Sequence, residues 1–104
     1  MEPVSDRIMS VPSELENELE KEFARSQKLL CDFLTVDLDI AFTFLNIARL
    51  TSDPEHRKSA LEKTKIALRS IRVFLERVQT PYSRMNFTKR ADELEKGLSQ
   101  AQFR

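Results

Sequence analysis

The sequence predicts an all-α fold, a small antiparallel four-helix bundle with up-down topology. One glycine and four prolines among 104 residues are too few for the turns of an all-β fold. Apolar residues recur at three- and four-residue steps along most of the chain, which is the period of an amphipathic helix. We expect a single helical domain over residues 13–104, because a chain of this length has room for one core. Residues 1–12 are expected to form a flexible N-terminal arm, since two prolines interrupt any helix there.

The first helix is predicted over residues 14–34. Ser13 and Glu16 have the spacing of a capping box, in which each side chain accepts a hydrogen bond from a free backbone amide of the first turn. Leu15 and Leu19 begin an apolar row that continues at helical spacing. Five glutamates crowd the first turns, where the helix dipole stabilises negative charge.

A second helix is predicted over residues 36–50, with Thr35 or Asp37 as its N-cap. Ten of its fifteen residues are apolar, so this helix is apolar around most of its circumference. Such a helix must be covered on more than one side. Three other helices could cover it, or two helices together with a second copy of the chain.

The third helix is predicted to be the longest, over residues 54–79. Ser52 or Asp53 can cap it, and Pro54 suits the first turn because its missing N–H has no partner there anyway. Its predicted end precedes Pro81, which cannot continue a helix. The third helix also carries the candidate basic face of the molecule, formed by Lys58, Lys65, Arg69 and Arg72.

The fourth helix is predicted over residues 83–99. Gly97, the only glycine, is placed either at its C-terminal cap or in a frayed last turn. Short connections favour side-by-side packing of sequence neighbours, which gives the up-down bundle. The alternative architecture is a three-helix core whose last helix is exchanged with a second chain.

The charges divide the chain into two halves. Residues 1–55 carry twelve Asp and Glu against five Lys and Arg, a net charge of −7. Residues 56–104 carry five against twelve, a net charge of +7. The two halves either pair within one bundle or present opposite charges to partners.

The most favoured function is a non-catalytic protein–protein interaction or assembly module, with a homodimer as one of its forms. The second helix has more apolar circumference than a small bundle hides, which makes it a candidate interface. Two β-branched residues lie outside the core row of the third helix at a spacing of seven. The candidate interface residues are Leu38, Phe42, Leu50, Ile66 and Val73.

Nucleic-acid binding through the basic face is the alternative. Phosphate neutralisation by such a face would be sequence-blind and sensitive to salt. We rank it below protein binding because the chain has zero net charge, contains no nucleic-acid-binding motif and has an acidic first helix able to cover the bases.

A second alternative, ranked lower, is a ribonuclease. Six residues separate Arg49 from His56. This pair is similar to the Arg-x(4–6)-His motif of HEPN-type ribonucleases, which are small helical domains. The resemblance implies that Arg49 would neutralise a phosphate and that His56 would act as acid or base on the 2′-hydroxyl. Leu50 stands where such families usually place a polar residue.

No other chemistry is indicated, so we expect no enzyme activity and assign no catalytic, cofactor-binding or metal-binding residues. A single histidine without a second ligand does not make a metal site. The lone Cys31 excludes an intrachain disulfide and suits a reducing compartment, so a cytoplasmic location is expected. No secretory signal and no apolar run long enough to span a membrane are present in the sequence.

Overall fold

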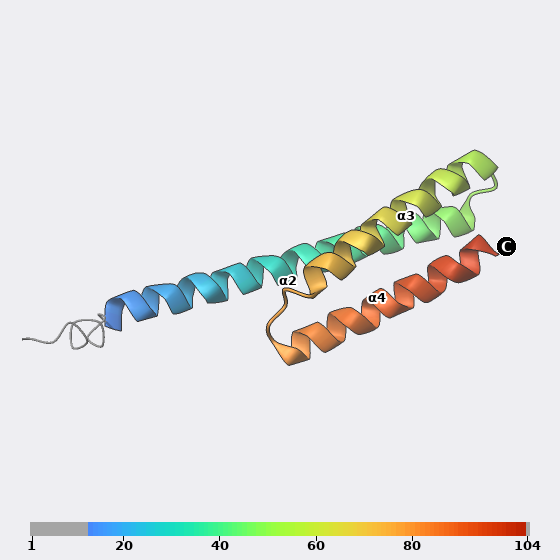
Figure 1. Ribbon diagram of the computed structural model, residues 1–104. Helices are drawn as coiled ribbons and strands as arrows, with labels where there is room; N and C mark the ends of the chain where they lie inside the picture. Colours follow the sequence, from blue (N-terminus) through green and yellow to red (C-terminus); the bar gives the residue numbers. More distant parts are fainter. Residues whose placement is uncertain (1–12, 104) are drawn as a thin grey trace, which may run out of the picture.

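Three helices that run up, down and up form the fold of residues 13–103, the part of the chain that the computed structural model describes (Figure 1). Helix α2 comprises Ser13–Leu50, α3 comprises Pro54–Leu75 and α4 comprises Pro81–Gln102. The all-α prediction is therefore confirmed, whereas the four-helix bundle is wrong for the described residues, which form three helices. The predicted arm, residues 1–12, lies outside the described residues.

The predicted first and second helices are one continuous helix of 38 residues. Its sequence contains neither glycine nor proline, so nothing in it stops a helix. The Thr35 hydroxyl does not cap a new helix but donates to the Cys31 carbonyl oxygen, one turn back, at 2.9 Å. The predicted start of a second helix after Thr35 is thus wrong. The prediction that the third helix is the longest is wrong too, because α2 is longer than α3.

Helix α3 begins where the sequence predicts. The Asp53 carboxylate accepts a hydrogen bond from the Glu55 N–H at 3.0 Å, and proline occupies the first helical position. The helix ends at Leu75, earlier than predicted, because the chain tightens into a turn in which the Val78 N–H donates to the Leu75 carbonyl oxygen at 3.1 Å. Helix α4 begins at Pro81 and extends a few residues beyond both of its predicted ends.

Gly97 lies buried inside α4 rather than at its C-terminal cap. A Cβ atom at this position would lie 2.7 Å from Leu45 Cδ2 and 2.8 Å from Arg49 Nη2. Both atoms belong to α2, so the missing side chain allows α2 and α4 to approach closely. The predicted role of Gly97 as a cap or in a frayed turn is therefore wrong.

All three helices contribute to one core. Full burial of a Leu or Ile side chain contributes about 1.5–3 kcal/mol, which makes this cluster the main source of stability. The one buried polar residue among those described, Thr64, is satisfied because its hydroxyl donates to the Ala60 carbonyl oxygen at 2.8 Å. The buried cluster consists of Leu34, Leu38, Ala41, Leu45, Leu68, Ile71, Leu75, Val78, Ala91, Leu94, Leu98 and Ala101.

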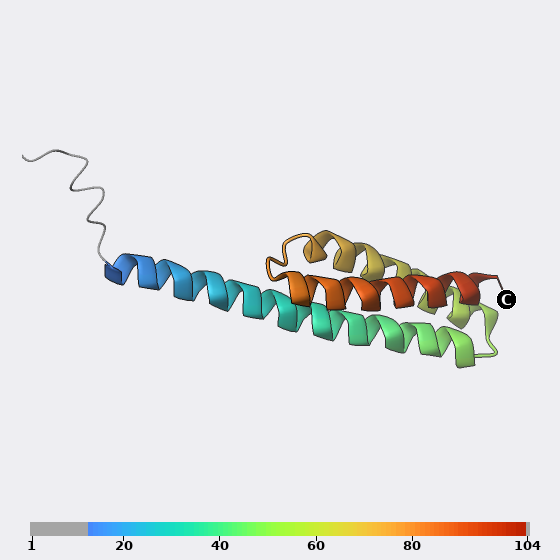
Figure 2. The same ribbon diagram turned by 90° about the horizontal axis from the view of Figure 1, so that it is seen from below.

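The bundle covers only part of α2. Every residue of 13–26 is exposed, and Gln27 is the first that is half-buried. We call residues 13–26 the projecting segment; at about 1.5 Å per residue it is about 21 Å long. Figures 1 and 2 show this end of α2 running past the turn between α3 and α4.

Candidate functional site

Helix α2 carries a second row of apolar residues besides the row that enters the core. Its positions recur from Leu15 to Leu50 at alternating steps of four and three residues. This spacing is the heptad pattern by which one helix packs along another. We call these positions the α2 seam. Its apolar members are Leu15, Leu19, Leu29, Phe33, Val36, Ile40, Ile47 and Leu50, and Glu22, Ser26 and Thr43 occupy the other three positions.

The α2 seam is open to solvent. Seven of its eight apolar side chains are exposed, with exposed fractions of 62% for Leu29, 57% for Val36 and 45% for Ile40, and Ile47 is half-buried. Helices α3 and α4 both pack on the other row of α2, which contains Leu34 and Leu38. A long row of exposed apolar side chains makes the α2 seam a candidate interaction surface, because soluble chains rarely leave such rows uncovered.

Helix α3 widens this surface. Ile66 and Val73 are 60% and 57% exposed. Ile66 lines the same hollow between the two helices as Ile40 and Phe44. Near its middle the seam contacts α3 through aromatic packing, since the ring of Phe33 meets that of Phe74 edge to face. We call the α2 seam together with Phe44, Ile66 and Val73 the apolar face.

Two charged residues border the hollow on the apolar face. Asp37 and Lys63 line it together with the apolar side chains. Asp37 Oδ2 is buried and has no hydrogen-bond partner among the described residues, and burial raises the pKa of this carboxyl above its ordinary value. The Lys63 ammonium lies over the ring of Phe44, 5.5 Å from its centroid. An acid and a base at the edges of an apolar floor can orient an incoming helix.

The five predicted interface residues differ in their exposure to solvent. Leu50, Ile66 and Val73 are exposed on the apolar face. Leu38 is completely buried in the core, so it offers no surface to a partner. Phe42 is half-buried towards α4, with the guanidinium of Arg90 over its ring at 5.7 Å from the centroid.

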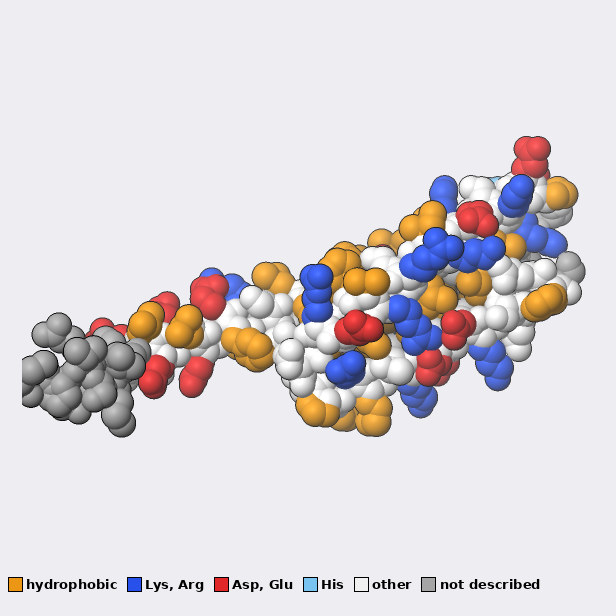
Figure 3. Space-filling model, viewed as in Figure 1, with side chains coloured by type: hydrophobic (Ala, Val, Ile, Leu, Met, Phe, Trp, Pro, Cys, Tyr) orange, Lys and Arg blue, Asp and Glu red, His pale blue; other side chains and the backbone are white. Residues whose placement is uncertain are grey.

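The predicted basic face lies along α3, with two of its four residues engaged in ion pairs. Lys65 pairs with Glu62 at 3.2 Å, and Arg72 binds carboxylates of α4 at 2.8 and 3.2 Å. Lys58 and Arg69 are exposed. Lys and Arg side chains gather over the bundle, whereas acidic and apolar ones alternate along the projecting segment (Figure 3). Among the ion pairs of the described residues, none joins the projecting segment to α3 or α4.

The two residues of the ribonuclease-like pair occupy different surroundings. The guanidinium of Arg49 lies against Gly97 of α4. His56 is exposed in the first turn of α3.

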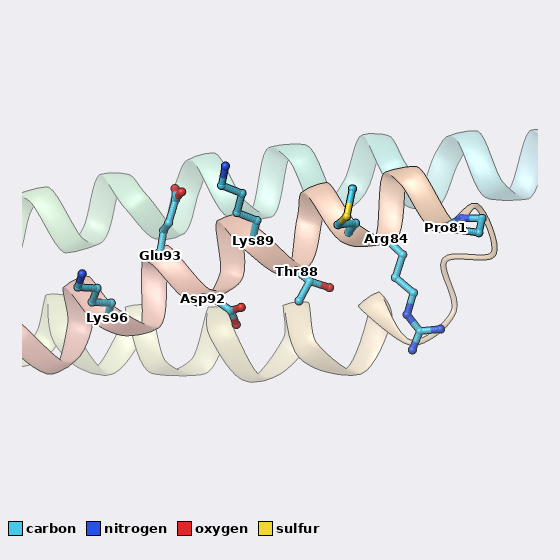
Figure 4. Close-up of a pocket in the computed structure, with 8 residues that line it drawn as sticks. Pro81, Arg84, Thr88, Lys89, Asp92, Glu93 and Lys96 are labelled. Carbon is cyan, nitrogen blue, oxygen red and sulfur yellow. The ribbon is translucent and has the colours of Figure 1, made fainter.

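A shallow trough on α4 is the other candidate for a binding site. Residues of α4, from Pro81 to Lys96, form its walls. Lys89 and Glu93 point to one side of the trough, whereas Arg84 points to the other (Figure 4). Small-molecule sites are concave and converge a few polar groups on one ligand. The side chains of this trough diverge, so it lacks that arrangement.

The remaining site classes find no support in residues 13–103. These residues contain no group of three His, Cys, Asp or Glu side chains placed to hold a metal ion. None of their helices combines the length and apolar character needed to cross a membrane. Comparisons with models of protein families, with curated proteins and with solved structures find no match. Function must therefore be inferred from the surface of the chain itself.

Sequence reasoning missed the α2 seam as a unit because it divided the helix near Thr35. The division separated Leu15, Leu19 and Leu29 from Val36 and Ile40, so the alternation of four and three was interrupted. The signal was present in the sequence: the spacing continues without a break, and neither glycine nor proline occurs from residue 13 to residue 50.

Proposed function

We propose that this chain is a non-catalytic assembly module whose apolar face binds a helix of a protein partner. The observation that supports the proposal is the α2 seam, a heptad row along a 38-residue helix that the chain's own bundle leaves exposed. An apolar groove that receives an amphipathic helix is a common mode of recognition, read through anchors at heptad spacing.

The size of the apolar face suits this task. Burying the exposed half of one such side chain contributes about 1 kcal/mol. Association costs about 4–15 kcal/mol in lost translational and rotational freedom. The seven exposed apolar side chains of the α2 seam, together with those of the incoming helix, thus supply a stabilisation of the same order as that cost. Phe33 and Phe44 are aromatic, a residue class that is enriched at the cores of protein interfaces.

Binding of a polyanion has weaker support. Arg72 and Arg90 each bind carboxylates within the bundle, Arg90 through Asp39 at 2.9 Å. These guanidinium groups are held by partners that a phosphate would have to displace. We therefore rank nucleic-acid binding and ribonuclease activity below helix binding. The lone thiol of Cys31 fits a reducing cytoplasm, which we propose as the compartment.

The proposal is tested by substituting the apolar face. Ile40→Asp places a charge at the centre of the face, where the half-exposed side chain can change without disturbing the core. Met85→Asp is the matched control, because it makes the same kind of change at an exposed apolar residue on α4. Solution mass is measured for each purified chain, and each tagged chain is used to capture partners from cells that express it naturally.

We expect self-association, or capture of a defined partner, that Ile40→Asp abolishes and Met85→Asp preserves. Circular dichroism checks that both variants keep their helical content. The proposed function is contradicted if the chain is a monomer and captures no protein whose binding is lost on Ile40→Asp.

A further inference from the structure

We infer that the helix bound by the apolar face is α2 of a second copy of this chain, placed antiparallel to the first. The inference rests on the proposed function and names its partner. The two-fold axis would cross α2 near its middle, close to residues 31 and 32. The projecting segment of each copy would then lie on the apolar face of the other.

The length of the α2 seam is the first reason. The bundle accounts for α2 only from Gln27 onwards, yet the seam continues to Leu15 and Leu19 in the projecting segment. A short foreign helix on the hollow beside Ile40 and Ile66 would leave these two leucines exposed. A second copy in antiparallel orientation covers them, because residues 13–26 of one chain then lie along residues 37–50 of the other.

Charge is the second reason, and it decides the orientation. The projecting segment carries five glutamates against Lys21 and Arg25, and none of its ion pairs reaches α3 or α4 in the described residues. In the antiparallel pair it lies beside the first half of the partner's α3. Within residues 54–66 of α3, Lys63 lines the hollow of the apolar face, whereas Arg57, Lys58 and Lys65 line another hollow together with Gln102 of α4.

Lys63 is the basic residue best placed for this contact. It lines the hollow of the apolar face with Ile40 and Ile66, so a helix docked there passes directly beside it. Two-fold symmetry repeats the match at both ends of the dimer. In a parallel pair, the five glutamates of one copy would lie against the five glutamates of the other. Repulsion between like charges disfavours that orientation.

The first experiment measures the solution mass of the full chain by light scattering over a range of concentrations. We expect a dimer that Ile40→Asp converts to a monomer and that Met85→Asp leaves intact. Lys63→Glu should weaken dimerisation several-fold at low salt, and less at high salt, because screening reduces the contribution of an exposed charge. Lys89→Glu, on the outer face of α4, is its matched control and should not weaken the dimer.

The second experiment determines the orientation. The Leu19→Cys chain is mixed with a Thr43→Cys or Leu50→Cys chain, each also carrying Cys31→Ala, and the mixture is treated with a short bismaleimide. An antiparallel pair gives cross-links between the two different chains. Cross-linking of Leu19→Cys chains only to one another shows a parallel pair and overturns the inference.

The outcomes separate this inference from the proposed function. A chain that stays monomeric with its helices intact overturns the second-copy assignment. If that monomer captures another protein, and Ile40→Asp abolishes the capture, the apolar face still binds a protein partner and the proposed function stands. If no protein is captured in a way that Ile40→Asp abolishes, both the inference and the proposed function fail.

Discussion

The side chain of Gln27 fastens α2 to the turn that precedes α4 through Gln79. The Gln79 N–H donates to Gln27 Oε1 at 2.9 Å, and Gln27 Nε2 donates in turn to the Arg77 carbonyl oxygen at 3.2 Å. Gln27 therefore satisfies two backbone groups of the turn at once. It also marks the boundary of the bundle, because every residue before it in α2 that the structure describes is exposed.

Gln27→Ala should lower the free energy of unfolding by about 1 kcal/mol, because two hydrogen bonds to the turn are lost and water replaces them in part. Urea denaturation measures the change. Asn17→Ala in the projecting segment is the control and should alter stability by less than about 0.5 kcal/mol. Equal stabilities for the two variants would mean that the turn does not depend on Gln27.

Gly97→Val should destabilise the chain by about 1–3 kcal/mol, because the added atoms meet Leu45 and Arg49 where α2 and α4 approach. Gly97→Ala should cost less, since the better helix propensity of alanine, about 1 kcal/mol, offsets part of the crowding. Thermal unfolding by circular dichroism measures both. Ser99→Val, exposed on the same helix, should be nearly neutral.

Two of the predicted interface residues should respond oppositely to truncation. Leu38→Ala removes a completely buried side chain and should lower stability by about 2–5 kcal/mol. Leu50→Ala, at a residue that is 85% exposed, should change stability little and should weaken dimerisation instead. Denaturation midpoints and solution mass, measured on both variants, check this division. A large loss of stability for Leu50→Ala would contradict it.

Asp37 should make stability depend on pH. Because burial raises its pKa in the folded chain above the ordinary value of about 3.9, the folded chain holds this proton more tightly than the unfolded chain does. The contribution of the protonated carboxyl is complete below pH about 4 and is lost as the pH rises through the raised pKa. Asp37→Asn should therefore be more stable than the natural chain at pH 7.

The pH dependence is checked by urea denaturation of both chains between pH 4 and pH 7. The stability difference in favour of Asp37→Asn should grow as the pH rises. Lys63, the base that lines the same hollow, is present in both chains, so its own contribution to stability cancels in the difference between them. A constant difference across this range would show that the carboxyl of Asp37 does not titrate differently on folding.

A polyanion column should retain the chain weakly. Arg72 and Arg90 are held by carboxylates of the bundle, which leaves fewer free cations on the basic half than the sequence contains. We expect elution from heparin below about 200 mM salt, because few phosphate-like contacts would be made. Strong retention that Lys58→Glu and Arg69→Glu abolish, together with RNA cleavage lost on His56→Ala, would favour the nucleic-acid alternatives over helix binding.

Local signals predicted the elements that depend on local chemistry. The Asp53-Pro54 start of α3 was predicted because a cap and a proline act within one turn. The break near Thr35 was predicted on the same kind of signal and is wrong, because a hydroxyl can bond back to its own helix as readily as it can cap a new one. Of the predicted interface, Leu50, Ile66 and Val73 are exposed and Leu38 is not.

The sequence by itself determined that the chain is helical, where α3 begins, and that the residues of α2 are apolar on more than one side. Tertiary structure decided which apolar row of α2 became the core and which was left to solvent. Periodicity shows that two rows exist but not which of them a neighbour covers. That depends on the lengths and directions of α3 and α4, which reach back only as far as Gln27, and on the contact at Gly97 that draws α4 onto one side of α2.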